Sequence, residues 1–197
     1  EIADETRGFE TGAVDYIHKP FSPAVVAARV QTHLALRETR QQLARQLLAI
    51  RAELETARQI QLSILPREFP NLANLDIAAR YIPMTSVAGD FYDFLAVDEH
   101  RLGILIADVS GHGMPAALIA SMLKIAFAAQ SAHALDPPRV LSGLNQALCG
   151  KFKDHYVTAA YALIDTDART LLYAGAGHPP LLVREHSSGK VRPLLEN

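Results

Sequence analysis

The sequence predicts an α+β sandwich, because pairs of strand-like segments precede and follow two helix-like segments. Each strand pair is rich in aromatic, β-branched and aliphatic residues and is interrupted by a short polar turn, as in a β-hairpin. The three pairs are Gly89–Val97 with Arg101–Asp108, Tyr156–Ile164 with Thr170–Ala174, and Leu181–Arg184 with Val191–Leu194. A further strand is predicted at Leu75–Pro83. The helices are predicted at Met114–Ala132 and at Pro138–Phe152, with Asp136 near the start of the second.

Composition limits the classes of function that the chain can serve. It has 197 residues, 49% of them hydrophobic, and a net charge of −2, so it has room for one full globular domain and a fragment. A near-neutral charge without a Lys/Arg stripe gives no electrostatic basis for nucleic-acid binding. Cys149 is the only cysteine, which excludes a disulfide within the chain, and its apolar helical neighbours predict a buried thiol. No signal peptide or apolar run of membrane-spanning length occurs, so we expect a cytoplasmic protein without a membrane partner.

The stretch Val87–Gly113 carries the candidate chemistry. A tight turn at Asp98-Glu99-His100 would pair residues whose numbers sum to 198, and this register places Asp90 opposite Asp108. Side chains directly opposite each other share one face, with Cβ atoms roughly 4.5–5.5 Å apart. Two carboxylates at that distance repel each other unless a cation lies between them.

The surroundings of this pair favour a divalent cation. Asp108 ends the apolar run LGILIAD, which is typical of a central strand covered on both faces, where a carboxylate needs a partner. A glycine-bracketed turn follows and leads into a helix, so the backbone carbonyl near Val109 can face the same point. Carboxylates, carbonyls and water are the ligands of Mg²⁺ and Mn²⁺. The alternative is that Asp90 merely begins a strand and Asp108 caps the next helix, because a slip of one residue would put the carboxylates on opposite faces.

The segments GDFYD and IADVSGHGMPAALIAS resemble the bacterial branch of the metal-dependent PPM (PP2C-like) serine/threonine phosphatases, the group of the sporulation and stress-response phosphatases. The resemblance extends over Ala57–Asn197 and includes RQIQLSILP and YAGAGHPPLL, and Ala88 stands where a second glycine is usual. It implies two antiparallel sheets stacked between helical layers, with a site for Mn²⁺ or Mg²⁺ at one edge of the sheets. By motif position, the catalytic and metal-ligating residues would be Asp90, Asp108 and, through its carbonyl, Val109. Asp108 would bridge two ions, and water held between them would hydrolyse a phosphoserine or phosphothreonine.

Other polar residues in these segments are weaker candidates. His112 could protonate the leaving oxygen or could shape its turn by hydrogen bonding, and His178 is expected to fix the turn in AGAGHPP. Asp93 lies three residues after the first carboxylate, so it should point to the other face of the strand. Ser110 and Ser121 have no His/Asp set at triad spacing, which argues against a serine hydrolase.

Residues 1–36 are predicted to be the end of a receiver domain. A short helix at Glu1–Gly12 and a strand at Ala13–Ile17 precede a helix that begins at Pro23, with Ser22 as its N-cap. The run GAVDYIHKPFSPAVVAARVQTHL resembles the last helix, strand and helix of a two-component response-regulator receiver domain.

This second resemblance implies a partner and a residue role. Lys19 would contact the acyl phosphate of an intact receiver, and the Lys19–Pro20 bond would be cis. An upstream histidine kinase would phosphorylate the intact receiver. The phospho-acceptor aspartate would lie before Glu1, so we expect that this chain is not a working receiver.

Residues 37–65 are predicted to form a coiled-coil signalling linker. Apolar residues recur every seven positions, with Leu47 and Leu54 between them and with Arg40 and Gln61 as polar exceptions. The seven-residue series is Leu36, Leu43, Ile50, Ala57 and Ile64. A parallel homodimer is favoured over a single amphipathic helix packed on its own domain, because polar residues leave the opposite side well solvated.

The phosphatase-like domain is predicted to span residues 66–197. Members of the PPM group continue past the position of Asn197 with a TDG segment and a further aspartate that supply metal ligands, so we expect an incomplete metal site here. The favoured hypothesis is the phosphatase output of a response regulator, acting on a phosphorylated regulatory protein such as an anti-sigma-factor antagonist. The alternative is a catalytically inactive adaptor of the same fold.

Overall fold

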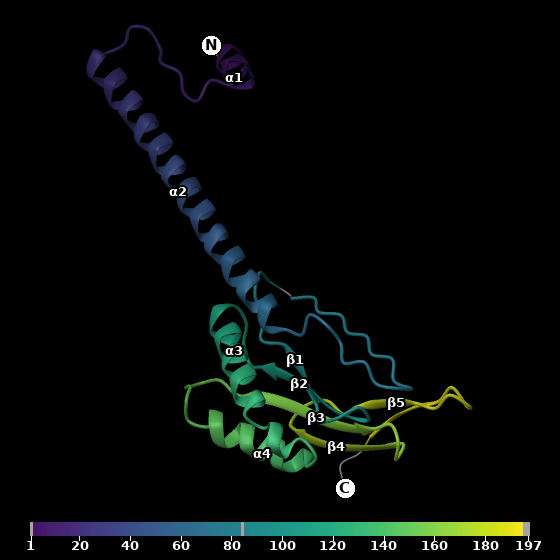
Figure 1. Ribbon diagram of the computed structural model, residues 1–197. Helices are drawn as coiled ribbons and strands as arrows, with labels where there is room; N and C mark the ends of the chain where they lie inside the picture. Colours follow the sequence, from purple (N-terminus) through teal and green to yellow (C-terminus); the bar gives the residue numbers. More distant parts are fainter. Residues whose placement is uncertain (1, 84, 195–197) are drawn as a thin grey trace. The chain divides into compact units, whose positions relative to one another are not determined.

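The computed structural model describes residues 2–83 and 85–194, and the chain divides into two compact units, Glu1–Ala52 and Glu53–Asn197 (Figure 1). The first unit contains α1 (Ile2–Glu10) and most of α2 (Pro23–Ile64), a continuous helix of 42 residues. α2 begins at Pro23, as predicted. Proline suits the first helical position because the N–H group that it lacks would have no acceptor within the helix there. The Lys19–Pro20 bond is cis, as the resemblance to receiver domains implies.

The strand predicted at Ala13–Ile17 is not formed. Its residues are irregular, because none of the described residues of this unit forms a strand with which they could pair. The Asp15 carboxylate instead accepts a hydrogen bond from Arg29 at 2.8 Å and lies 3.4 Å from His33, and both partners belong to α2. The hydrogen bond from Arg29 lowers the pKa of Asp15. An ion pair therefore ties this segment to the helix where strand pairing was expected.

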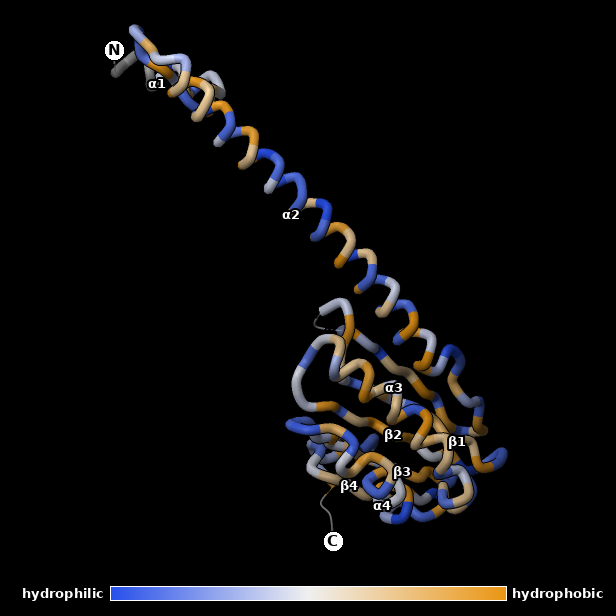
Figure 2. Tube along the Cα trace, turned by 90° about the vertical axis from the view of Figure 1, so that its left-hand side faces the viewer, coloured by the Kyte–Doolittle hydropathy of each residue, from blue (hydrophilic) through white to orange (hydrophobic). Residues whose placement is uncertain are grey.

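The predicted seam of α2 is exposed along much of the helix. Leu43 is 55% exposed and Ile50 is 52% exposed, and Figure 2 shows apolar and polar residues alternating along α2. The end of the helix differs, because Leu62 and Ile64 pack partly against the core of the second unit, and Leu65, the residue after the helix, is buried in that core. None of the helices in the described part of the chain is long and apolar enough to cross a membrane.

The second unit is built on a four-stranded antiparallel sheet in the order β1-β2-β3-β4, which confirms the predicted α+β class. The strands are β1 (Phe91–Ala96), β2 (Arg101–Val109), β3 (Val157–Asp165) and β4 (Thr170–Ala176). A separate two-stranded sheet pairs β5 (Leu182–Arg184) with β6 (Val191–Pro193), so all three predicted hairpins are present. The β1–β2 turn is held by Asp98, whose carboxylate accepts the backbone N–H groups of His100 and Arg101.

Two helices, α3 (Met114–Ala128) and α4 (Pro137–Leu148), cover one face of the four-stranded sheet (Figure 1). A short 3₁₀ helix, η1 (Ser131–His133), lies between them in sequence. Successive strand residues point to opposite faces, so alternate ones are buried against the helices. The core includes Phe91, Leu105, Tyr161, Phe127 and Val140, each 0–1% exposed.

Hydrogen bonds satisfy the polar groups that this packing buries. The Tyr161 hydroxyl donates to the carbonyl of Ala134 at 2.8 Å. The Asp136 side chain accepts the backbone N–H of Arg139, which makes it the N-cap of α4 and confirms the predicted start of this helix.

Three predictions about element boundaries are wrong. The segment Leu75–Pro83 contains only an isolated bridge from Leu75 to Leu72, because no described strand pairs with the rest of it. α3 ends at Ala128, four residues early, and η1 follows. α4 ends before Cys149, which therefore falls outside the apolar helix face and is exposed.

Candidate functional site

The β1–β2 hairpin brings Asp90 and Asp108 together. Every pair of residues along this ladder follows the predicted register. The ladder continues one step beyond β1, because the Val109 N–H donates to the Gly89 carbonyl at 3.3 Å. Asp90 and Asp108 therefore form a non-hydrogen-bonded pair, whose Cα atoms lie about 4.5 Å apart and whose side chains share one face. The alternative of a one-residue slip is excluded.

Glycine is needed at position 89 because two backbones meet there. A Cβ on Gly89 would lie 2.6 Å from the Val109 carbonyl oxygen, closer than packing allows. The turn from β2 to α3 also depends on glycines, since Gly111 and Gly113 have φ angles of 88° and 76°. Gly89 thus lets the Val109 carbonyl lie beside the start of β1, and Gly111 and Gly113 allow the chain to turn shortly after Asp108.

Burial and charge both act on Asp90. Burial is the main reason that the pKa of Asp90 is raised. The negative charge of Asp108 raises this pKa further, whereas His178 lowers it. The carboxylates are therefore close enough to repel each other. Both still reach solvent, and Ile106 on the same face is 42% exposed. The expectation that β2 is covered on both faces holds in part. α3 and α4 lie on one face. On the other face Leu102 is fully buried, whereas Ile106 is not.

Thr158 and His178 add polar groups beside the carboxylates. Thr158 on β3 lies opposite Asp108, so their side chains share a face. The Thr158 Oγ1 lies 2.9 Å from Nδ1 of His178, which follows β4. Thr158 was not a candidate from sequence, because the β2–β3 register is set by packing across two intervening helices and not by a local turn.

Comparison with known proteins identifies the family. Residues 98–197 match the family model of Stage II sporulation protein E (SpoIIE), which is more than half of the chain. The chain belongs to the SpoIIE family. It is 37% identical over 145 residues to phosphoserine phosphatase RsbP, and 34% identical over 151 residues to phosphoserine phosphatase RsbU, both of Bacillus subtilis (strain 168).

The structural comparison agrees with this SpoIIE-family assignment. The SiaA-PP2C domain of Pseudomonas aeruginosa superposes with a TM-score of 0.56 at 29% identity, over 65% of this chain and 53% of that domain. The alignments with RsbP and RsbU cover 71% and 76% of this chain but only 36% and 43% of those relatives. The chain therefore spans less than half the length of the two curated relatives.

The donor atoms at this SpoIIE-family site fit a hard divalent cation. Phosphatases of the PP2C type depend on metal ions, and Asp90 and Asp108 place two carboxylates on one face, where a cation would relieve their repulsion. The Val109 carbonyl lies against Gly89 at the same strand end. No cluster of three or more His, Cys, Asp or Glu side chains that could hold a metal occurs within residues 2–83 and 85–194. Among the described residues, the two carboxylates and the Val109 carbonyl are the protein oxygens that would hold such an ion.

The structure separates the weaker candidates from this SpoIIE-family site. Asp93 is 6% exposed on the helix-facing side of β1, where it forms an ion pair with Lys124 of α3 at 2.7 Å, so the prediction that it points to the other face of the strand is confirmed. The Ser110 hydroxyl accepts the Tyr156 N–H, and the Ser121 hydroxyl donates within α3. Neither of these hydroxyl contacts involves a histidine.

His112, His155 and Lys19 are the remaining residues to place. His112 is exposed in the glycine-bracketed turn before α3. His155 was not predicted; its Nδ1 lies 2.8 Å from the Ser110 carbonyl and helps to hold that turn. Lys19 is exposed in the first unit, and its phosphate contact stays a prediction.

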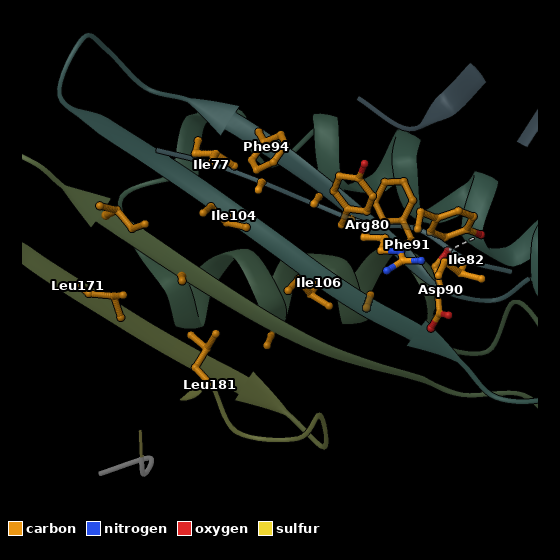
Figure 3. A pocket seen from close by; sticks show the side chains of 18 residues that line it. Ile77, Arg80, Ile82, Asp90, Phe91, Phe94, Ile104, Ile106, Leu171 and Leu181 are labelled. Atoms are coloured by element: carbon orange, nitrogen blue, oxygen red, sulfur yellow. Dashed lines mark hydrogen bonds between the residues drawn. The ribbon is translucent and has the colours of Figure 1, made fainter. Parts of the chain in front are cut away.

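An apolar cavity of about 670 Å³ adjoins the carboxylate pair. Its floor is the face of the sheet that α3 and α4 leave uncovered, and Figure 3 shows Asp90 at one end of a row of apolar side chains. The row includes Phe94, Ile104, Ile106 and Leu171. Its only acidic lining residue among those described is Asp90, so the polar chemistry of this face is concentrated at the end of the hairpin.

Proposed function

We propose that this SpoIIE-family chain carries the catalytic part of a metal-dependent protein serine/threonine phosphatase that uses Mn²⁺ or Mg²⁺. The observation that carries the proposal is the pairing of Asp90 with Asp108 on one face of the β1–β2 hairpin. Similarity to two phosphoserine phosphatases, RsbP and RsbU, supports the substrate class.

Each residue of the site has a separate role in binding or positioning. Asp90, Asp108 and the Val109 carbonyl would hold the divalent ions. Thr158 keeps the ring of His178 beside them. When bound, the ions would activate water and neutralise the phosphate oxygens, so the protein need not supply a nucleophile of its own.

We extend the proposal to regulation by a two-component system. The resemblance of residues 1–36 to the end of a receiver supports a response regulator, phosphorylated by a histidine kinase, whose output is this phosphatase. The substrate would be a phosphorylated regulatory protein such as an anti-sigma-factor antagonist.

The exposed apolar residues of α2 support a homodimer through the coiled coil. Leu43 and Ile50 are both more than half exposed, and a second helix would bury them. Sedimentation analysis of the chain and of a Leu43→Glu variant tests this proposal. We expect a dimer that the charged side chain dissociates, and a monomer in both samples would contradict the proposal.

Hydrolysis of a phosphoserine peptide with Mn²⁺ tests the catalytic proposal. We expect phosphate release by the full-length protein that contains this chain, and loss of release in its Asp108→Asn variant. Asp76→Asn changes the same charge on an exposed loop residue and serves as the matched control. Equal rates in the full-length protein and in its Asp108→Asn variant, or no hydrolysis by either, would reject the enzyme.

The adaptor hypothesis has one observation in its favour. The described residues supply no cluster of three or more metal-ligating side chains, and an incomplete ligand set is typical of a binding module derived from an enzyme. Calorimetric titration with Mn²⁺ separates the two hypotheses. An enzyme should bind Mn²⁺ through Asp90 and Asp108, whereas an adaptor that has lost the site should release no heat of binding.

A further inference from the structure

Four polar side chains form a row across the end of the sheet that carries the carboxylate pair. Asp90 and Asp108 face each other on the β1–β2 hairpin, and Thr158 lies opposite Asp108 on β3. Asp108 is therefore one strand spacing, about 4.8 Å, from Thr158. The row ends at His178, two residues after β4, whose Nδ1 lies 2.9 Å from the Thr158 Oγ1. His178 lowers the pKa of Asp90, which agrees with a position near the pair.

The Thr158 hydroxyl determines which nitrogen of the His178 ring carries a hydrogen. Its oxygen lies 3.5 Å from the backbone carbonyl of Asp108 and 2.9 Å from Nδ1 of His178. A contact of 3.5 Å is at the outer limit of a hydrogen bond, so the single hydroxyl hydrogen is donated to Nδ1. A neutral imidazole that accepts at Nδ1 carries its hydrogen on Nε2. Among the described residues, Nε2 forms no hydrogen bond, so this donor is available to a ligand.

A phosphate ester needs such donors. Its phosphoryl group carries a charge of about −1.5 to −2 near pH 7, and its oxygens accept hydrogen bonds. The carboxylates of Asp90 and Asp108 can only accept, and the hydrogen of Thr158 is already used. His178 is thus the member of this row that has a hydrogen to give to a phosphoryl oxygen.

We propose that Nε2 of His178 donates a hydrogen bond to a phosphoryl oxygen of the substrate, and that Thr158 holds the ring in the tautomer that this contact requires. The contact transfers no proton, and it serves the phosphate ester and the phosphate product alike. This inference rests on the proposed function and names a substrate-binding residue of the same site. The competing explanation is that His178 only fixes the turn before Pro179.

Two substitutions separate these roles, because asparagine and glutamine place an amide at different distances from the backbone. Asparagine reaches about as far as Nδ1 and can keep the bond to Thr158, whereas glutamine reaches about as far as Nε2. In the full-length protein with Mn²⁺, we expect His178→Asn to weaken inhibition by inorganic phosphate and to lower kcat/KM for a phosphoserine peptide. Each loss should be roughly 10- to 100-fold, as for the loss of a hydrogen bond to a charged group. His178→Gln should retain more of both properties.

His186→Asn is the matched control for these measurements. His186 is exposed between β5 and β6, so the same substitution there should change neither phosphate inhibition nor hydrolysis. Phosphate inhibition and hydrolysis by His178→Asn that equal those of the control would overturn the inference. Properties that are better retained in His178→Asn than in His178→Gln would also overturn it, because the turn alone would then account for His178.

NMR of the ring nitrogens tests the tautomer without turnover. The sample is the metal-free full-length protein with ¹⁵N-labelled histidine at pH 8, where an ordinary histidine is neutral. The His178 signals are identified by their loss in His178→Asn. We expect the Nε2–H form of the ring, and we expect this preference to weaken in Thr158→Val, which removes the hydroxyl at nearly constant shape. An Nδ1–H ring in the unsubstituted protein would overturn the inference.

The outcomes separate this inference from the proposed function. If the unsubstituted full-length protein hydrolyses no phosphoserine peptide, the proposed function fails and the substrate contact fails with it, whereas the NMR spectrum still decides whether Thr158 fixes the ring of His178. If His178→Asn does not fold, Thr158→Val takes its place in the phosphate measurement. Weaker inhibition by phosphate in Thr158→Val would then support the inference, and unchanged inhibition would overturn it.

Discussion

Replacing Asp90 with asparagine should stabilise the metal-free protein while it removes metal binding. Burial and the charge of Asp108 raise the pKa of Asp90, so the folded state binds the proton more tightly than the unfolded chain does. The stability that this group contributes is present below its usual pKa of 3.8 and is lost as the pH rises through the raised value. At pH 7 the ionised pair therefore opposes folding, and asparagine removes the repulsion.

The magnitude follows from the separation of the two carboxylates. Unit charges about 5 Å apart interact with roughly 0.8 kcal/mol at the dielectric constant of water and roughly 3 kcal/mol at an effective value of 20. Both side chains reach solvent, so screening places the effect near the lower value, about 1 kcal/mol. For a unit of this size, about 1 kcal/mol corresponds to a shift of roughly 2–4 °C in Tm.

Thermal unfolding in EDTA and in Mn²⁺ measures both effects. In EDTA at pH 7, Asp90→Asn should unfold at a higher temperature than the unsubstituted chain, and the gain should disappear at acid pH. In Mn²⁺ the unsubstituted chain should gain stability and Asp90→Asn should not, because ligand binding to the folded state raises stability by mass action. Asp76→Asn is the charge-matched control. An Asp90→Asn variant no more stable than this control in EDTA would refute the repulsion and the geometry behind it.

Three further predictions concern the framework around the site. Asp98→Ala should lower Tm at pH 7 but not near pH 2. Hydrogen bonds, of which the one from the Arg101 side chain has the largest effect, lower the pKa of Asp98 to about 2, so the stability that this carboxylate contributes above pH 3.8 is lost as the pH falls toward 2. A difference in Tm that does not change with pH would contradict this. Lys124→Met should lower the free energy of unfolding by about 1–3 kcal/mol in urea titrations, because it leaves the buried Asp93 carboxylate without its partner. Tyr161→Phe should cost about 1–2 kcal/mol by removing its hydrogen bond to a carbonyl. Burial raises the pKa of Tyr161 to about 12, so this cost should be constant from pH 5 to 9, and a cost that changes over that range would count against it.

Local signals in the sequence were sufficient for the hairpins and for the carboxylate pair. The β1–β2 register depends on the turn that Asp98 closes. This turn connects the two strands directly, so its length and hydrogen bonds determine which side chains face each other. The same holds for the start of α4, where Asp136 caps the helix and proline follows. Strand pairing could not be predicted for Leu75–Pro83, because an extended apolar segment becomes a strand only where a partner is present.

The contacts that complete the site join segments that are distant in sequence. Gln61 appeared in the heptad pattern only as a polar exception, whereas the structure places it 27 residues from its partner in a buried position. Thr158 lies 50 residues from Asp108, and neither its strand register nor its bond to His178 follows from any local turn. A polar residue that interrupts an apolar helical seam has two explanations, solvation or a buried partner, and only tertiary packing distinguishes them.

Gln61 in the last turn of α2 bonds to both backbone groups of Ala88, two residues before Asp90, so metal binding and the end of α2 should influence each other in both directions. Two carboxylates that repel would relax by moving apart if the backbone were free, but Gln61, Gly89 and Tyr81 hold that backbone, so the repulsion persists until a cation relieves it. If an intact helical turn raises the affinity for Mn²⁺, then Mn²⁺ must stabilise that turn by the same factor, because coupling between two equilibria is reciprocal. Amides in the last turn of α2 should exchange more slowly when Mn²⁺ is added, and this protection should be absent in Gln61→Met even at saturating metal. A helix end that is indifferent to the metal in the unsubstituted chain would mean that α2 anchors the domain without controlling its site.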